Sequence, residues 1–212
     1  MGVPVLIYGK SGSGKSRSLK NFGEEEIFLV NVIRKQLPFR KKFKYVYNSD
    51  NYERIKKGLK TMPTKTAVID DAGYLQTNAF MRGHCGPKSG SSSFDLYNSI
   101  ADQAWSLINF IKEELPDDAI VYIIMHEEES DSGNVKLRTI GKLLDQKVCL
   151  EGMVTIALRC ICDGDRHYFR TQSDGFDISK TPEDLLDLEI ENDLKAVDSA
   201  IREYWNLGGN EE

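Results

Sequence analysis

The sequence predicts an α/β domain whose sheet is mostly parallel, and three observations support this prediction. A compact apolar run at residues 3–8 stops at a glycine-rich turn, as a parallel strand does when helices cover both of its faces. Segments with helical spacing separate the further apolar runs at 27–32, 66–69 and 120–125. Near the C-terminus, runs at 154–162 and 167–170 flank Asp163-Gly164 and predict an antiparallel hairpin at one edge of the sheet. We therefore expect a single domain over residues 1–212.

The remaining elements follow from hydrophobic periodicity and from breaker residues. A short strand is expected at 44–47, and helices are expected at 16–22, 51–60, 94–115, 141–150 and 193–205. Glycine, serine and proline between 81 and 93 predict a long loop. The polar stretch 127–134 predicts a mobile loop after the strand at 120–125.

Composition narrows the class of protein. The 212 residues are 40% hydrophobic and 29% charged, which is typical of a globular protein. A net charge of -5 argues against a surface that is basic all over. No apolar run approaches the roughly 18 residues of a membrane span, and the first residues lack the basic start of a signal peptide. We expect a cytoplasmic protein that does not enter a membrane.

The four cysteines show no paired CxxC spacing. They stand at Cys85, Cys149, Cys160 and Cys162. Free thiols in or near the core are expected in a reducing compartment. A zinc site that joins His84 and Cys85 to Cys160 and Cys162 is the alternative, but the spacing fits no standard zinc motif.

A phosphate-binding loop is the strongest motif. Gly9, Gly14, Lys15 and Ser16 match G-x-x-x-x-G-K-[ST], between a predicted strand and a predicted helix. Backbone N–H groups and the helix N-terminus would surround the phosphates, Lys15 would reach the β and γ oxygens, and Ser16 would bind magnesium. The motif predicts ATP and Mg²⁺ as ligands. The nucleotide-binding set is Gly9, Lys10, Ser11, Gly12, Ser13, Gly14, Lys15, Ser16 and Arg17.

An acidic pair ends the predicted strand at 66–69. Asp70 is the expected second magnesium ligand after Ser16, since such sites take a carboxylate from the tip of a neighbouring strand. Asp71 would either polarise the attacking water or cap the following segment. His126 ends the strand at 120–125, and it would sense the γ-phosphate if that strand neighbours the first one. The alternative for His126 is a loop histidine with a solvent or carboxylate partner. The expected catalytic set is Lys15, Asp70, Asp71 and His126.

Two basic regions are candidates for contact with nucleic acid. Lys136, Arg138 and Lys142 would touch nucleic-acid phosphate or the γ-phosphate of a neighbouring subunit, or they form a solvated face. The other cluster is interleaved with aromatic residues, as single-strand binding surfaces are, although an ordinary exposed loop is the alternative. Its cations are Arg34, Lys35, Arg40, Lys41, Lys42 and Lys44, and its aromatics are Phe39, Phe43, Tyr45 and Tyr47.

Four segments carry a resemblance to a known family. They read VIDDAGYL, IIMHEEES, TIGKLLDQKVCLEGMVTIALRC and HYFRTQSDGFDISKTPED, in that order after the loop motif. Over nearly its whole length the chain resembles phage-encoded P-loop ATPases, small RecA-like proteins labelled as phage nucleotide-binding or AAA-domain proteins. Some of these are single-strand annealing recombinases. The GKLLD and YFRTQSDG segments are the more specific hints.

The resemblance implies a RecA-like core that binds ATP, assembles into homo-oligomeric rings or filaments, and acts on single-stranded DNA in recombination or replication. In a phage-encoded protein the compartment would be the host cytoplasm. Gly9 to Ser16 carry over as the nucleotide loop, Asp70 as the Walker B acid and His126 as the end of the sensor strand. Residues 136–142 would lie near a subunit or DNA interface. The acidic run 127–129 departs from the pattern, because RecA-like proteins often place a DNA-binding loop there.

Three functions are consistent with these observations. The first is an ATP-binding and ATP-hydrolysing RecA-like protein that acts on single-stranded DNA. The second is a nucleotide-dependent assembly or loader factor that binds a phage or host replication or recombination protein. The third is a small-molecule kinase, which should carry an arginine-rich lid, and the segment 82–93 is poor in arginine.

Overall fold

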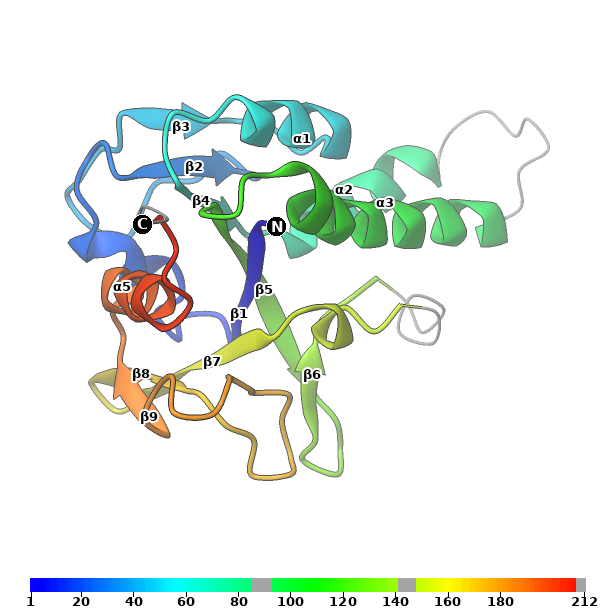
Figure 1. The fold of residues 1–212 in the computed structure, drawn as a ribbon. Coiled ribbons are helices and arrows are strands. Elements are labelled where there is room, and N and C mark those ends of the chain that lie inside the picture. The colour runs from blue at the N-terminus through cyan, green and yellow to red at the C-terminus, as the bar shows by residue number, and fades with distance from the viewer. Residues whose placement is uncertain (85–92, 141–147, 209–212) are drawn as a thin grey trace.

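The computed structural model describes residues 1–84, 93–140 and 148–208, which form one nine-stranded sheet (Figure 1). Six neighbouring strands are parallel, in the order β3 (Tyr45–Tyr47), β2 (Ile27–Asn31), β4 (Thr66–Asp70), β5 (Ile120–Glu129), β1 (Val3–Gly9) and β7 (Ile156–Asp163). The antiparallel strands β8 (Arg166–Arg170) and β9 (Glu189–Glu191) follow β7, and β6 (Val135–Leu137) pairs with β5 outside this order. The predicted mostly parallel sheet with an antiparallel C-terminal edge is confirmed.

Helices cover both faces of the sheet (Figure 1). One face carries α1 (Tyr52–Lys60), α2 (Gly73–Gly83) and α3 (Ser93–Glu114). The other face carries α5 (Leu194–Tyr204) and the short 3-10 helix η1 (Ser16–Asn21). A second 3-10 turn, η2, spans Glu151–Met153. No helix among the described residues is long and apolar enough to cross a membrane.

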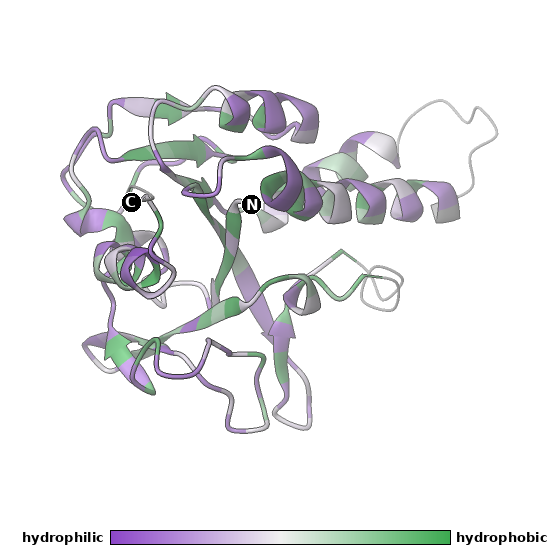
Figure 2. Cartoon of the chain, in the orientation of Figure 1, coloured by the Kyte–Doolittle hydropathy of each residue, from purple (hydrophilic) through white to green (hydrophobic). Residues whose placement is uncertain are grey.

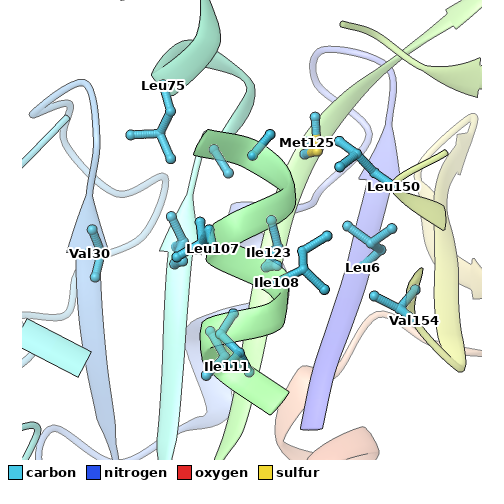
Figure 3. Packing of buried hydrophobic residues seen from close by; sticks show 14 of the residues in the cluster. Leu6, Val30, Leu75, Leu107, Ile108, Ile111, Ile123, Met125, Leu150 and Val154 are labelled. Carbon is cyan, nitrogen blue, oxygen red and sulfur yellow. The ribbon is translucent and has the colours of Figure 1, made fainter. Parts of the chain in front are cut away.

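Strand β1 shows why its sequence is apolar at every position. Leu6 and Tyr8 point to the face under α3, whereas Val5 and Ile7 point to the face under α5. Both faces are therefore buried, as in other sheets with helices on each side. Figure 3 shows Leu107, Ile108 and Ile111 of α3 packed over the strands, and their burial gives a core on that side. Figure 2 shows hydrophobic colour along the central strands and hydrophilic colour over much of α1 and α3.

The expectation of a loop at 127–134 is wrong for 127–129, whereas 130–134 form the turn that follows them. Strand β5 continues to Glu129 and forms an antiparallel hairpin with β6. Each of the three glutamates has a cationic partner: Glu127 pairs with Arg159, Glu128 with Lys136 and Glu129 with Lys10. The last three positions of β5 are glutamates that form ion pairs, so hydrophobic periodicity did not reveal that the strand continues through them.

Other boundaries also differ from the expectations. Helix α2 was not expected and takes up the first part of the predicted loop at 81–93, while 85–92 lie outside the described residues. Of the helix expected at 141–150, residues 141–147 are not described and 148–150 are not helical. The hairpin turns at Gly164-Asp165, one residue later than expected, with Gly164 at φ +56°. The short edge strand β9 was not predicted.

Candidate functional site

The glycines of the loop between β1 and η1 are each required for a different local reason. A Cβ on Gly9 would lie 2.3 Å from the carbonyl oxygen of Cys160, so the strand cannot carry a side chain there. Gly12 and Gly14 have φ values of +81° and +103°, which side chains rarely adopt. The loop motif thus forms the tight backbone curve that a phosphate cradle needs.

Strands β7 and β8 support this loop from its inner side. The Sγ of Cys160 donates to the carbonyl oxygen of Ser13 at 3.1 Å, and Nδ1 of His167 lies 2.8 Å from the same oxygen. The Nδ2 of Asn192 donates to the Cys160 sulfur at 3.2 Å. Burial raises the pKa of the Cys160 thiol to about 11, so it remains protonated and able to donate.

Sequence reasoning missed the three side chains that form this support. Cys160 was noted as a free thiol or, in the alternative, as a zinc ligand. His167 was noted only as part of a predicted strand, and Asn192 lay outside every predicted element. The pairing of His167 with Cys162 in the β7–β8 register follows once the hairpin is known. Their contact with a loop about 150 positions earlier has no local signal in the sequence.

The motif lysine is enclosed by its own loop. The Nζ of Lys15 donates to the carbonyl oxygens of Gly9 at 2.8 Å and Lys10 at 2.7 Å. Desolvation by burial lowers the pKa of Lys15. The helix after the loop is confirmed in position, but it is a 3-10 helix of six residues. Because helix-end charge comes from several aligned peptides, η1 would contribute less to anion binding than a long α-helix.

Ser16 and Asp70, the two predicted magnesium ligands, are in contact. The Oγ of Ser16 donates to Oδ1 of Asp70 at 2.8 Å, although 54 positions separate them. Asp70 ends β4, which is separated from β1 by β5 alone. Burial, together with the neighbouring charge of Asp71, raises the pKa of Asp70. Hydroxyl and carboxylate oxygens are ligands that Mg²⁺ accepts, so the donor set fits the predicted cation.

Asp71 lies between two basic side chains. Its backbone is left-handed, with φ +59°, and its side chain is 3% exposed. Lys35 forms an ion pair with Oδ2, and Nε2 of His126 lies 3.5 Å from Oδ1. Burial by itself would raise the pKa of Asp71, but the His126 and Lys35 contacts outweigh it and lower the pKa. The capping alternative for Asp71 is wrong, because the N-cap of α2 is Ala72, with no side-chain cap bond.

His126 lies at the edge of the sheet where it was expected. In the parallel register of β1 and β5 it stands opposite Gly9. His126 also has a carboxylate partner, Asp71, as the alternative prediction expected. The rings of Tyr74 and His126 meet edge-on, with their centroids 6.2 Å apart.

A cavity of about 470 Å³ joins these groups. The glycine-rich loop and the start of η1 supply Ser11, Gly12, Gly14, Lys15, Ser16 and Arg17, and the other lining residues are Lys35, Gln36, Pro38, Asp71, His126 and His167. Not every predicted residue reaches this cavity. Ser13 turns inward and is 4% exposed, and Lys10 projects outward to pair with Glu129. Asp70 lies behind Ser16, 2% exposed, and does not line the cavity.

The predicted basic region at 136–142 does not form a free basic surface in the part of the chain that is described. Lys136 pairs with Glu128 across the β5–β6 hairpin. Arg138 is exposed, and its backbone N–H donates to the His126 carbonyl oxygen at 2.8 Å. Lys142 lies outside the described residues.

The cluster at 34–44 borders a groove of about 370 Å³ beside the cavity. Arg34, Lys35, Lys41 and Lys42 line this groove, which we call the basic groove. The predicted aromatic platform is wrong for three of its residues. Phe43 is buried in the core, and Tyr45 and Tyr47 pack against the core under α1. Phe39 lines the groove and contacts Phe43 edge-on. The groove therefore has four cations in its lining, and its aromatic lining is limited to Phe39 and Phe43.

The described residues contain neither a cluster of metal-binding side chains nor a disulfide bond. Within 1–84, 93–140 and 148–208, no three His, Cys, Asp or Glu side chains are grouped to hold a metal. A magnesium ion bound through one hydroxyl, one carboxylate and phosphate oxygens needs no such group. Cys149, Cys160 and Cys162 are free thiols, while Cys85 is not described.

No protein-family model matches the chain, and no curated protein matches it.

Proposed function

We propose that this protein binds ATP with Mg²⁺ in the cavity beside the P-loop and hydrolyses it. The contact between Ser16 Oγ and Asp70 Oδ1 carries the proposal. A complete GKSGSGKS loop and an acidic strand end, far apart in sequence, meet at the two atoms that would hold one magnesium ion. A cavity of about 470 Å³ next to them has room for a nucleotide.

The loop's own groups would bind the phosphates. Gly12 and Gly14 let backbone N–H groups turn inward, and Lys15 contributes the only buried ammonium among the described lining residues. Ser16 and Asp70 would hold Mg²⁺, which when bound neutralises charge on the phosphate oxygens. The RecA-like core belongs to this proposal. Its support is that β5, which carries His126, lies between the P-loop strand and the Asp70 strand.

Asp71 and His126 are the proposed catalytic side chains next to the phosphates. Both line the cavity, and they contact each other at 3.5 Å. Asp71, as a carboxylate, would accept a hydrogen bond from the attacking water and orient it. His126 would sense the γ-phosphate from the strand between the two phosphate-binding elements.

Single-stranded DNA is the proposed macromolecular substrate, in phage recombination or replication, with the protein as a homo-oligomer in the cytoplasm. The basic groove favours this over a protein partner, since its four cations suit a phosphate backbone. The acidic run 127–129 would repel the DNA backbone less than its three negative charges suggest, because each glutamate is paired with a cation. A loader factor that binds a replication protein is the alternative.

The test is steady-state ATP hydrolysis with and without single-stranded DNA. Lys15→Ala should abolish turnover while the protein remains folded, because it removes the cation at the β and γ oxygens. Lys10→Ala is the matched control within the loop, since Lys10 is exposed and directed away from the cavity. Wild-type turnover in Lys15→Ala would refute the site. Turnover that is indifferent to DNA would favour the loader factor.

A further inference from the structure

Lys35 lies in the wall between the nucleotide cavity and the basic groove. It lines both cavities, and its ammonium forms an ion pair with Asp71 on the nucleotide side. The segment that carries it, residues 33–44, has no regular secondary structure. One side chain thus faces both a carboxylate of the proposed catalytic site and a groove for anions.

The Lys35 contact occupies the carboxylate that the proposed reaction needs. Asp71 is 3% exposed, and its two oxygens face Lys35 and His126. A carboxylate held by two cation-capable partners has less capacity to accept a hydrogen bond from water. Opening one of these contacts would make Asp71 a better acceptor for a hydrogen bond from water.

Lys35 is the contact that can open. His126 belongs to β5, which is paired with strands on both sides, and its side chain is 25% exposed. The Lys35 side chain is 40% exposed and stands on the irregular segment. A long, flexible side chain at such a position can change partners without disturbing the sheet.

The positive charge of the groove would attract an anion that competes with Asp71 for Lys35. Arg34, Lys41 and Lys42 line the groove with it. Arg34 and Lys42 form no ion pair with any residue that the structure describes, and Lys41 donates to the carbonyl oxygens of Lys20 and Phe22. Asp71 is the anion that offsets the charge of Lys35. A phosphodiester strand in the groove would offer Lys35 a competing anion.

We propose that Lys35 is a latch that holds Asp71 in the resting site and is released by a phosphodiester strand in the basic groove. Release of Lys35 frees one oxygen of Asp71 for the attacking water, and turnover rises. The inference rests on the proposed function, because it assigns the regulation of that same ATP site. Lys35 acts through Asp71 and is therefore a positioning residue.

The experiment compares Mg²⁺-dependent ATP turnover of the wild type and Lys35→Met, with and without oligodeoxythymidylate. In the wild type, the strand should raise turnover by about 5-fold or more, the scale of a typical coupling between sites. Lys35→Met should show the raised turnover without the strand and gain little from adding it. Lys35→Arg, which keeps the charge, should restore the low basal turnover and the response.

Lys44→Met is the matched control, because Lys44 belongs to the same basic segment but pairs with Glu25 and lines neither cavity. It should retain wild-type turnover and response. Thermal unfolding verifies each fold, and Lys35→Gln replaces Lys35→Met if the latter does not fold. Turnover in Lys35→Met that is no faster than wild type, or still stimulated by the strand, overturns the latch alone. Absence of Lys15-dependent turnover in both proteins overturns the proposed function and the latch with it.

Discussion

Nδ1 of His167 lies 2.8 Å from the carbonyl oxygen of Ser13, so a C-terminal hairpin strand supports the glycine-rich loop near the N-terminus. The same imidazole would lie 2.7 Å from a Cβ placed on Gly14. The antiparallel edge of the sheet therefore restrains the loop as well as ending the sheet.

Gly14→Ala should lower the free energy of unfolding by about 1–3 kcal/mol, because the residue has φ +103° and its new methyl group would meet His167. Urea denaturation measures this change. Gly133→Ala is the control, since Gly133 has φ +81° but nothing within 4 Å of the added carbon. It should cost less, about 1 kcal/mol from backbone strain alone. Equal losses in the two variants would contradict a role for His167 in restraining the loop.

Ser16→Ala should raise the Mg²⁺ concentration needed for half-maximal turnover by about 10-fold or more, because it removes one of the two proposed protein ligands. Magnesium titrations of turnover give this value. Ser16→Thr keeps the hydroxyl and should behave nearly as the wild type. An unchanged magnesium requirement in Ser16→Ala would show that Ser16 is not a magnesium ligand.

Glu127→Ala should destabilise the protein by about 1.5–3 kcal/mol, since Arg159 loses its bidentate partner and keeps its ion pair with Asp177. The neighbouring Glu128→Ala removes an exposed ion pair with Lys136 and should change stability by less than about 1 kcal/mol. Chemical denaturation of both variants makes the comparison. A loss for Glu128→Ala as large as that for Glu127→Ala would refute this difference.

Cys160 should resist alkylation in the folded protein. Its sulfur is buried, and its pKa is raised to about 11, so at pH 8 little thiolate forms. Iodoacetamide labelling read by mass spectrometry should modify the exposed Cys162 first and Cys160 roughly 100-fold more slowly than in urea. Rapid labelling of Cys160 under native conditions would show that the support beneath the loop opens readily.

The sequence by itself determined the order of the main elements and the loop motif. Strands buried on both faces are continuously apolar, so 3–8, 27–32, 66–69 and 120–125 stood out. The motif has fixed positions because a tight phosphate cradle needs glycine, lysine and a hydroxyl in a set order. Asp70 could be selected as the partner of Ser16 from its place at the end of such a strand.

Only the tertiary structure decided which side chains surround the site. Lys35 was one of six cations in a basic cluster, and its contact with Asp71 depends on how an irregular segment crosses the edge of the sheet. His167 and Asn192 reach the loop only because β8 and β9 follow β7 in the sheet. Periodicity reports which face of an element is buried, whereas contacts between distant irregular segments depend on packing that no local pattern records.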